Sequence, residues 1–155
     1  MTTTAEPRRP SPADLAANAP ARRRAAARQA ELLAPAVLNR GERFRPLYNA
    51  AIRESRMNPH TRLVALVLAT YGNSRTGRVA EQPGLHRLAA GTGLAVGQVV
   101  VALRALETRG WVQHTGPARY EDAVLQPSIP AHAIPRLRTL PLTTTATITE
   151  GPTDA

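Results

Sequence analysis

The sequence predicts a mainly α-helical protein with one small β-hairpin. Apolar residues recur at helical spacing in three separate runs between residues 58 and 108. A run that alternates apolar and polar residues follows directly after Gly110. Both ends of the chain are rich in Pro, Thr and Ala and contain few large apolar residues. We therefore expect one domain between disordered tails.

The first half of the predicted domain contains two helices. The first is expected from Pro46 to Arg56. The second begins with Asn58 as N-cap and Pro59 in the first turn, which are the residue types preferred at those positions. Its apolar residues repeat at helical spacing, which predicts a buried face. That predicted face consists of Leu63, Leu66, Val67 and Thr70, widened by Val64, Leu68 and Tyr71.

A short helix, a glycine turn and a longer helix come next. Leu85, Leu88 and Ala89 mark one side of the short helix, which ends at Gly91–Gly93. The longer helix is expected from about Val96 to Thr108. Its residues at i, i+3, i+4 and i+7 form a continuous apolar stripe, which predicts burial. The stripe consists of Val99, Ala102, Leu103 and Leu106.

The β-hairpin is predicted immediately after the longer helix. Gly110 ends that helix, and Trp111–His114 alternates like a strand. Gly116 and Pro117 form the turn, and Tyr120–Leu125 is expected to return as the partner strand.

Three segments follow from this pattern. Residues 1–43 are expected to be an Arg-, Ala- and Pro-rich tail with a marginal helix at 21–34, because the apolar face of that helix is mostly Ala. Residues 44–127 form the domain. Residues 128–155 are expected to be a disordered Pro- and Thr-rich tail.

Charge and composition indicate the class of partner. The formal net charge is +9, and all 20 basic residues are Arg. This balance favours a polyanion such as nucleic acid, although a G+C-rich genome also favours Arg over Lys in any protein. The chain has no cysteine, no apolar signal sequence at its start and no apolar run long enough to span a bilayer. We therefore expect a cytoplasmic protein with no membrane partner.

The order of elements matches the winged helix-turn-helix, in which a helix pair is followed by a β-hairpin. The sequence also resembles bacterial winged-helix domains of plasmid and phage replication proteins and small transcriptional regulators. The residues that carry the resemblance are Leu88-Ala89, Thr92-Gly93-Leu94, Val99, Ala102-Leu103, Leu106-Glu107 and Arg109-Gly110-Trp111. The segment from Tyr48 to Arg62 resembles the residues that often precede this pattern, so the resemblance covers about Phe44 to Pro127.

The resemblance implies binding to double-stranded DNA, in transcription regulation or as a replication accessory factor. On the outward side of the longer helix, Gln98 can pair with adenine and Arg104 with guanine or a phosphate. Further candidate contacts come from the helix pair, the hairpin tip and the N-terminal tail. They are Thr92, Arg87, Arg109, Arg119, Arg22, Arg23 and Arg24.

An alternative function is open because the same helix carries several valines. Val96, Val100 and Val101 cannot neutralise phosphates, although they can contact thymine methyl groups. We expect all three to be exposed, so they can instead bind a protein partner or a second copy of the chain. The winged-helix scaffold would then be an interaction module with weak or no DNA binding.

Enzymatic chemistry is not expected. The four histidines share no metal-ligand spacing, and there is no cysteine to complete a metal site. The glycines between 91 and 97 do not follow a strand, and a chain without lysine has no P-loop lysine. We therefore expect no catalytic residue, no metal and no cofactor.

Overall fold

The computed structural model describes residues 18–139, which contain six α-helices, one short 3-10 helix and two strands. In chain order these are α2 (Ala19–Leu33), α3 (Phe44–Glu54), α4 (Pro59–Tyr71), α5 (Gly84–Thr92), α6 (Val96–Thr108), β1 (Val112–Thr115), β2 (Val124–Pro127), η1 (Ala131–Ala133) and α7 (Ile134–Thr139). The expected mainly helical fold with one small antiparallel sheet is confirmed. The outer parts of the predicted tails, residues 1–17 and 140–155, lie outside the described residues.

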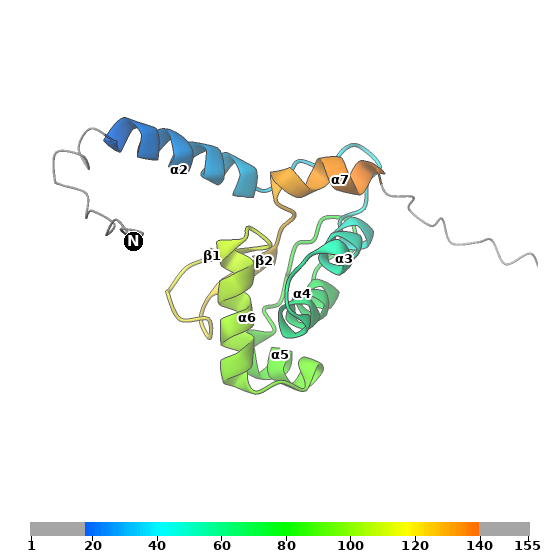
Figure 1. The fold of residues 1–155 in the computed structure, drawn as a ribbon. Coiled ribbons are helices and arrows are strands. Elements are labelled where there is room, and N and C mark those ends of the chain that lie inside the picture. The colour runs from blue at the N-terminus through cyan, green and yellow to red at the C-terminus, as the bar shows by residue number, and fades with distance from the viewer. Residues whose placement is uncertain (1–17, 140–155) are drawn as a thin grey trace, which may run out of the picture.

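Helices α3 to α6 pack around one apolar core, which includes the contacting rings of Phe44, Tyr48 and Trp111 (Figure 1). Helix α6 contacts both α4 and α5, and its predicted stripe faces them. The buried residues of α6 are the expected ones, Val99, Ala102, Leu103 and Leu106. One row of this helix therefore belongs to the core, and the opposite row is left for solvent.

Helix α4 begins as predicted but buries a different face. The Asn58 side chain accepts a hydrogen bond from the backbone N–H three residues later, at 2.8 Å. The predicted buried face is right for Val64 and Leu68, which are fully buried. It is wrong for Leu63, which is 37% exposed, and for Thr70, which is also exposed. Residues 63–69 are all apolar and surround the helix, so their spacing selects no single side. Packing against α3 and α6 selects the side made by Thr61, Val64, Ala65, Leu68 and Ala69.

Strands β1 and β2 form the antiparallel hairpin, with His114 opposite Leu125. The second strand begins at Val124, four residues later than predicted. The reason is Tyr120, which lies in the intervening loop and is buried there. The loop folds around this side chain and delays the return strand.

The predicted tail boundaries need correction on both sides of the domain. Residues 128–139 are packed, and Ile129, Ile134 and Leu137 join the core. The segment before α3 lies beside them, since the Ala36 N–H donates to the Ile129 carbonyl at 2.8 Å. The prolines near residue 130 prevent a long periodic pattern, so these buried apolar residues had no recognisable spacing in the sequence.

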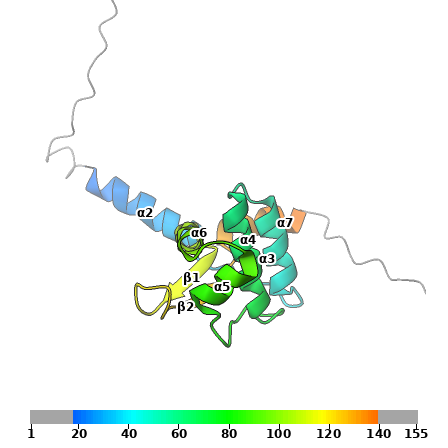
Figure 2. The same cartoon turned by 90° about the horizontal axis from the view of Figure 1, so that it is seen from below.

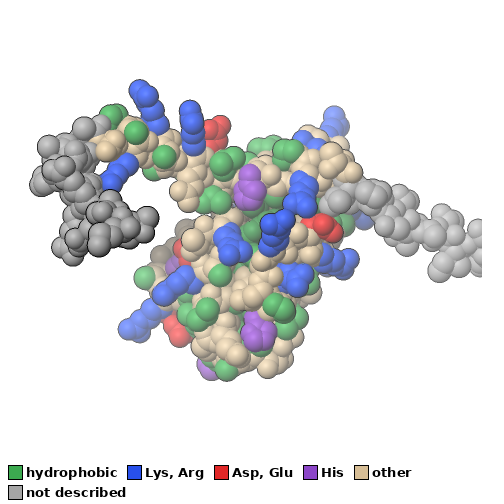
Figure 3. Space-filling model, viewed as in Figure 1, with side chains coloured by type: hydrophobic (Ala, Val, Ile, Leu, Met, Phe, Trp, Pro, Cys, Tyr) green, Lys and Arg blue, Asp and Glu red, His purple; other side chains and the backbone are tan. Residues whose placement is uncertain are grey.

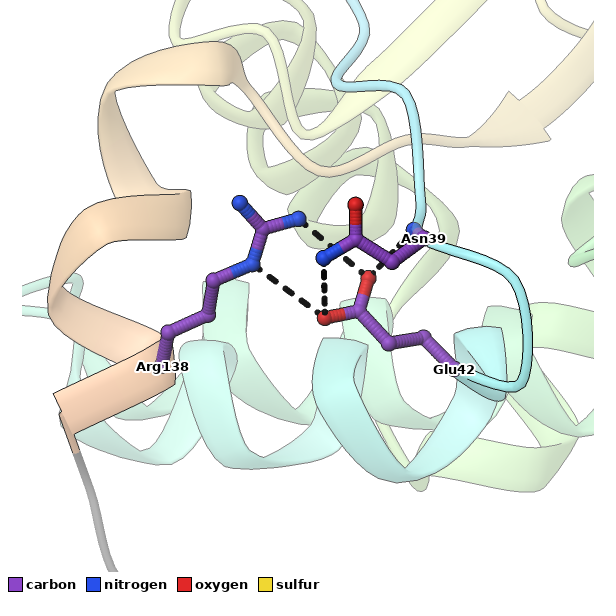
Figure 4. Close-up of polar contacts among 3 residues, drawn as sticks. All are labelled: Asn39, Glu42 and Arg138. Carbon is purple, nitrogen blue, oxygen red and sulfur yellow. Dashed lines mark hydrogen bonds and ion pairs between the residues drawn. The ribbon is translucent and has the colours of Figure 1, made fainter.

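An ion pair joins the two corrected segments (Figure 4). The Glu42 carboxylate accepts hydrogen bonds from the Arg138 guanidinium, at 3.2 and 3.4 Å, and from the Asn39 backbone N–H at 2.6 Å. These bonds to Arg138 and Asn39 hold the pKa of the Glu42 carboxyl below its usual value of 4.5. The interaction ties the loop before α3 to α7.

Helix α2 projects from the domain, as both views show (Figure 1, Figure 2). It corresponds to the helix expected at 21–34, and none of its residues is buried. Its C-terminal end is held by the domain: Ala34 accepts a hydrogen bond from the Ala131 N–H at 2.9 Å, and Leu32 one from the His132 ring at 3.0 Å. We call α2 the arm.

No single helix in the described part of the chain is long and apolar enough to cross a membrane. Helices α5 and α6 reach such a length and composition only together, with a bend of 100° between them.

The packing of α7 can be tested by one substitution and a matched control. Leu137→Ala should lower the free energy of unfolding by about 2–5 kcal/mol, because Leu137 is 3% exposed and its removal leaves a cavity. Leu32→Ala removes the same atoms from the arm, where Leu32 is 53% exposed, and should change stability little. Urea unfolding followed by circular dichroism measures both. Equal small effects would show that α7 is not part of the core.

Candidate nucleic-acid interface

The turn between α5 and α6 is closed by local hydrogen bonds. Gly93 has φ +69°, in the left-handed region that favours glycine. Its N–H donates to the Ala89 carbonyl at 2.8 Å and ends α5. Leu94 then packs, partly buried, against the core. The two helices are thereby held at the 100° bend.

The outward row of α6 brings several predicted site residues together. Gln98, Val101 and Arg104 are all exposed on this helix. Gln98 also has a structural role, because its side-chain oxygen accepts a hydrogen bond from the Ala95 N–H at 3.0 Å and caps the helix. Pairing with both edge atoms of an adenine would require Gln98 to release this bond. Arg104 is exposed, and its guanidinium also interacts with the Tyr120 hydroxyl of the hairpin loop.

The predicted valine face is smaller than expected. Val101 is 68% exposed, whereas Val96 and Val100 are partly buried and pack against the core. The expectation that all three valines are exposed is therefore wrong. Both valines pack at the edge of the core beside the buried stripe of α6.

Two further candidates are already engaged within the protein. The Thr92 hydroxyl donates to the Leu88 carbonyl at 2.7 Å, so it stabilises the end of α5. Arg87 forms an ion pair with Glu81 at 2.7 Å, with both side chains mostly exposed. An exposed pair of this kind contributes little to stability and can be exchanged for a phosphate contact.

A polar cluster attaches the hairpin loop to α6. The Tyr120 hydroxyl donates to the Glu107 carboxylate at 2.7 Å. His114 lies beside the Tyr120 ring, with ring centroids 5.1 Å apart, and its Nδ1 is 3.4 Å from Glu107. Its Nε2 is 2.7 Å from the Pro117 carbonyl. The cluster therefore holds both strand β1 and the loop against one turn of α6.

Burial and the neighbouring carboxylate raise the pKa of Tyr120. Burial is the largest cause, the hydrogen bond and negative charge of Glu107 add to it, and Arg104 opposes it. The pKa reaches about 12, compared with an ordinary value of 10.0. The phenol is therefore held in its neutral form as a hydrogen-bond donor to Glu107.

The hairpin loop presents mixed charge. Arg119 is exposed near its tip, as predicted, but Glu121 and Asp122 follow it and are also exposed. The DNA contact predicted for this loop rests on Arg119 alone. Any phosphate contact from this loop therefore depends on Arg119 extending away from the two carboxylates.

The remaining candidates lie at the other end of α6. Arg109 caps the C-terminal end of that helix, and Arg22, Arg23 and Arg24 are exposed on the arm. The C-terminal end of the arm at Leu33, which we call its root, contacts the same region. A Cβ atom added to Gly110 would lie 2.6 Å from the Leu33 carbonyl oxygen. Because α6 has 13 residues, about 20 Å separates the root of the arm from the α5–α6 turn.

On the face drawn in Figure 3, Arg side chains stand along the arm and over the upper part of the body, while the lowest part, around α5, shows none. Within residues 18–139, no group of three or more His, Asp or Glu side chains is arranged to hold a metal ion.

The cluster of Glu107, His114 and Tyr120 is not predicted by the sequence pattern. In that pattern Glu107 belongs to the family resemblance and Tyr120 to the expected return strand. The available signal was an aromatic residue among polar neighbours in a short loop, which is a common sign of an anchor side chain.

No protein-family model, no curated protein and no solved structure matches this chain.

The raised pKa of Tyr120, caused first by burial and then by Glu107, predicts a specific loss of stability at alkaline pH. A pKa that is raised in the folded state contributes stability below pH 10, and this contribution is lost as the pH rises from about 10 through about 12. The free energy of unfolding should therefore fall more steeply over this range in the wild type than in Tyr120→Phe. The chain has no lysine, and Tyr48, whose pKa is also raised by burial, is present in both proteins. Urea unfolding at pH 9 and pH 11.5 provides the comparison, and parallel losses would contradict the raised pKa of Tyr120.

Proposed function

We propose that this chain is a DNA-binding protein whose α5–α6 pair and β-hairpin act as a winged helix-turn-helix. The observation that carries the proposal is the arrangement around α6. One side of this helix is fully buried, its opposite row is exposed, α5 crosses its start and the hairpin follows its end. In this motif the exposed row of the second helix faces the DNA major groove.

Helix α6 would contact bases through its exposed row. Arg104 supplies a guanidinium that can donate two hydrogen bonds to a guanine edge. Val101 offers a methyl contact to thymine. Gln98 contributes its side-chain N–H group without losing the cap at Ala95. This row is short and carries one cation, so it supplies selectivity rather than most of the binding energy.

Most of the affinity would come from the arm. Its arginines are exposed and its helix has no buried residue, so it presents charge without disturbing the core. The arm begins about 20 Å from the α5–α6 turn. Arg22, Arg23 and Arg24 lie near its far end, and Arg24 is about 14 Å of helix from Leu33. These arginines would therefore contact phosphates outside the stretch of duplex bound by the helix-turn-helix.

The role in the cell is proposed from the resemblance described above: transcription regulation, or an accessory function in plasmid- or phage-type replication. The interaction module is the weaker alternative. It needs a broad apolar surface, and of the three valines only Val101 is largely exposed. A single valine offers little area for a stable protein contact.

DNA binding should be strongly salt-dependent. The full chain should bind a fluorescein-labelled 24-base-pair duplex, with affinity falling about a hundredfold or more between 50 and 200 mM salt as counterions are released. The variant Arg22→Gln/Arg23→Gln/Arg24→Gln should reduce the slope of log affinity against log salt by up to about 3. Fluorescence anisotropy measures both. Binding that is absent at 50 mM salt, or independent of salt, would refute the proposal.

Base reading by α6 requires a different measurement. Arg104→Ala should weaken binding to a selected preferred site by about 1–3 kcal/mol and weaken binding to random duplex less, because a guanine contact is lost only where guanine is present. Arg78→Ala removes an exposed cation from the α4–α5 connection and is the matched control. The deciding quantity is the specificity ratio, the affinity for the preferred site divided by the affinity for random duplex, measured by competition. An unchanged ratio in Arg104→Ala would restrict this residue to phosphate contact.

A further inference from the structure

A cavity of about 520 Å³ lies where the arm joins the domain. Its walls come from the arm, the end of α3, the junction of α6 with β1, and the segment of η1 and α7. Its volume is within the range of small-molecule sites, about 300–1,000 Å³. None of the residues predicted to contact DNA lines it except Arg109.

The inner wall of the cavity is apolar. Leu33 of the arm lines it together with three buried residues from other elements, Met57, Trp111 and Leu137. These side chains come from four separate parts of the chain. The wall therefore exists only in the folded domain with the arm in place.

The rim of the cavity is cationic. Arg56, Arg109 and Arg136 line it and are exposed. The ion pairs found within residues 18–139 involve none of these three side chains. Glu54 is the one carboxylate at the cavity, so the formal balance of its charged side chains is positive. Figure 3 shows Arg side chains over the region where α2 and α7 approach the body.

We propose that this cavity binds a small amphipathic anion, in which a carboxylate or sulfonate is joined to an apolar chain or ring. The apolar part would cover Leu33, Met57 and Trp111, and the anionic group would accept hydrogen bonds from the arginines at the rim. Guanidinium groups are suited to this role because they donate two parallel hydrogen bonds to a carboxylate. A neutral apolar molecule would leave those donors unused, and a cation would be repelled.

The root of the arm forms one wall of the cavity. Gly110 has φ +76° and allows the Leu33 backbone to approach closer than any side chain would permit. A ligand held between Leu33 and Arg109 would contact both the arm and the end of α6. Any effect of the ligand on DNA binding through the arm rests on the proposed function. Binding of the ligand to the cavity does not.

Three probes of equal chain length test the chemistry of the cavity. Octanoate, octan-1-ol and octylammonium are titrated into the full chain by calorimetry, with the emission of Trp111 as the local readout. Trp111 is the single tryptophan of the chain and lines the cavity. Octanoate should bind about a hundredfold more tightly than octan-1-ol, a difference expected from two charge-assisted hydrogen bonds, one from each of two arginines, and octylammonium should bind weakest.

Variants place the binding at the cavity. Arg109→Gln and Arg136→Gln should each weaken octanoate about tenfold without changing octan-1-ol, while Arg78→Gln, the same charge change elsewhere, should have no effect. Ala133→Phe fills the cavity and should abolish binding of both probes, with a melting curve to verify folding. Equal affinity for octanoate and octan-1-ol, equal effects of Arg78→Gln and Arg109→Gln, or no binding of octanoate at millimolar concentration would each overturn the proposal. These outcomes do not depend on DNA.

Discussion

Burial of one side of α6 is the constraint on which the rest of the structure depends. Val99, Leu103 and Leu106 are completely buried against α4 and α5. Because side chains on a helix are fixed relative to one another, burying this row fixes which residues face outward. The row with Gln98, Val101 and Arg104 is therefore held in one orientation by the aliphatic core, with no polar contact needed to set it.

Both ends of α6 are then used to place other elements. At its start, Gly93 and the Gln98 cap fix the bend toward α5. At its end, Gly110 lets the arm approach, and Glu107 holds the hairpin loop through Tyr120. The hairpin and the arm thus take their positions from the same helix. A displacement of α6 would move the proposed DNA contacts and one wall of the cavity together.

Charge is divided among these elements in an uneven way. The arm carries several arginines and one carboxylate, the outward row of α6 carries one arginine, and the hairpin loop combines Arg119 with two carboxylates. A net charge of +9 describes the whole chain but hides this distribution. In the proposed function, the arm supplies electrostatic attraction and α6 supplies selectivity. The cavity rim adds Arg56 and Arg136, which neither task requires, and shares Arg109 with the candidate DNA contacts.

The sequence by itself determined the elements whose signals are local: the Asn58 cap, the glycine turn at Gly93, the buried stripe of α6 and the exposed row opposite it. Only the tertiary structure decided the face of α4, where a continuous apolar run has no preferred side until α3 and α6 pack against it. It also decided that Val96 and Val100 are partly covered, that Ile134 and Leu137 belong to the core, and that Tyr120 anchors the hairpin loop. Each of these depends on a contact between residues separated in the chain or held in irregular segments, and such contacts leave no periodic pattern in the sequence.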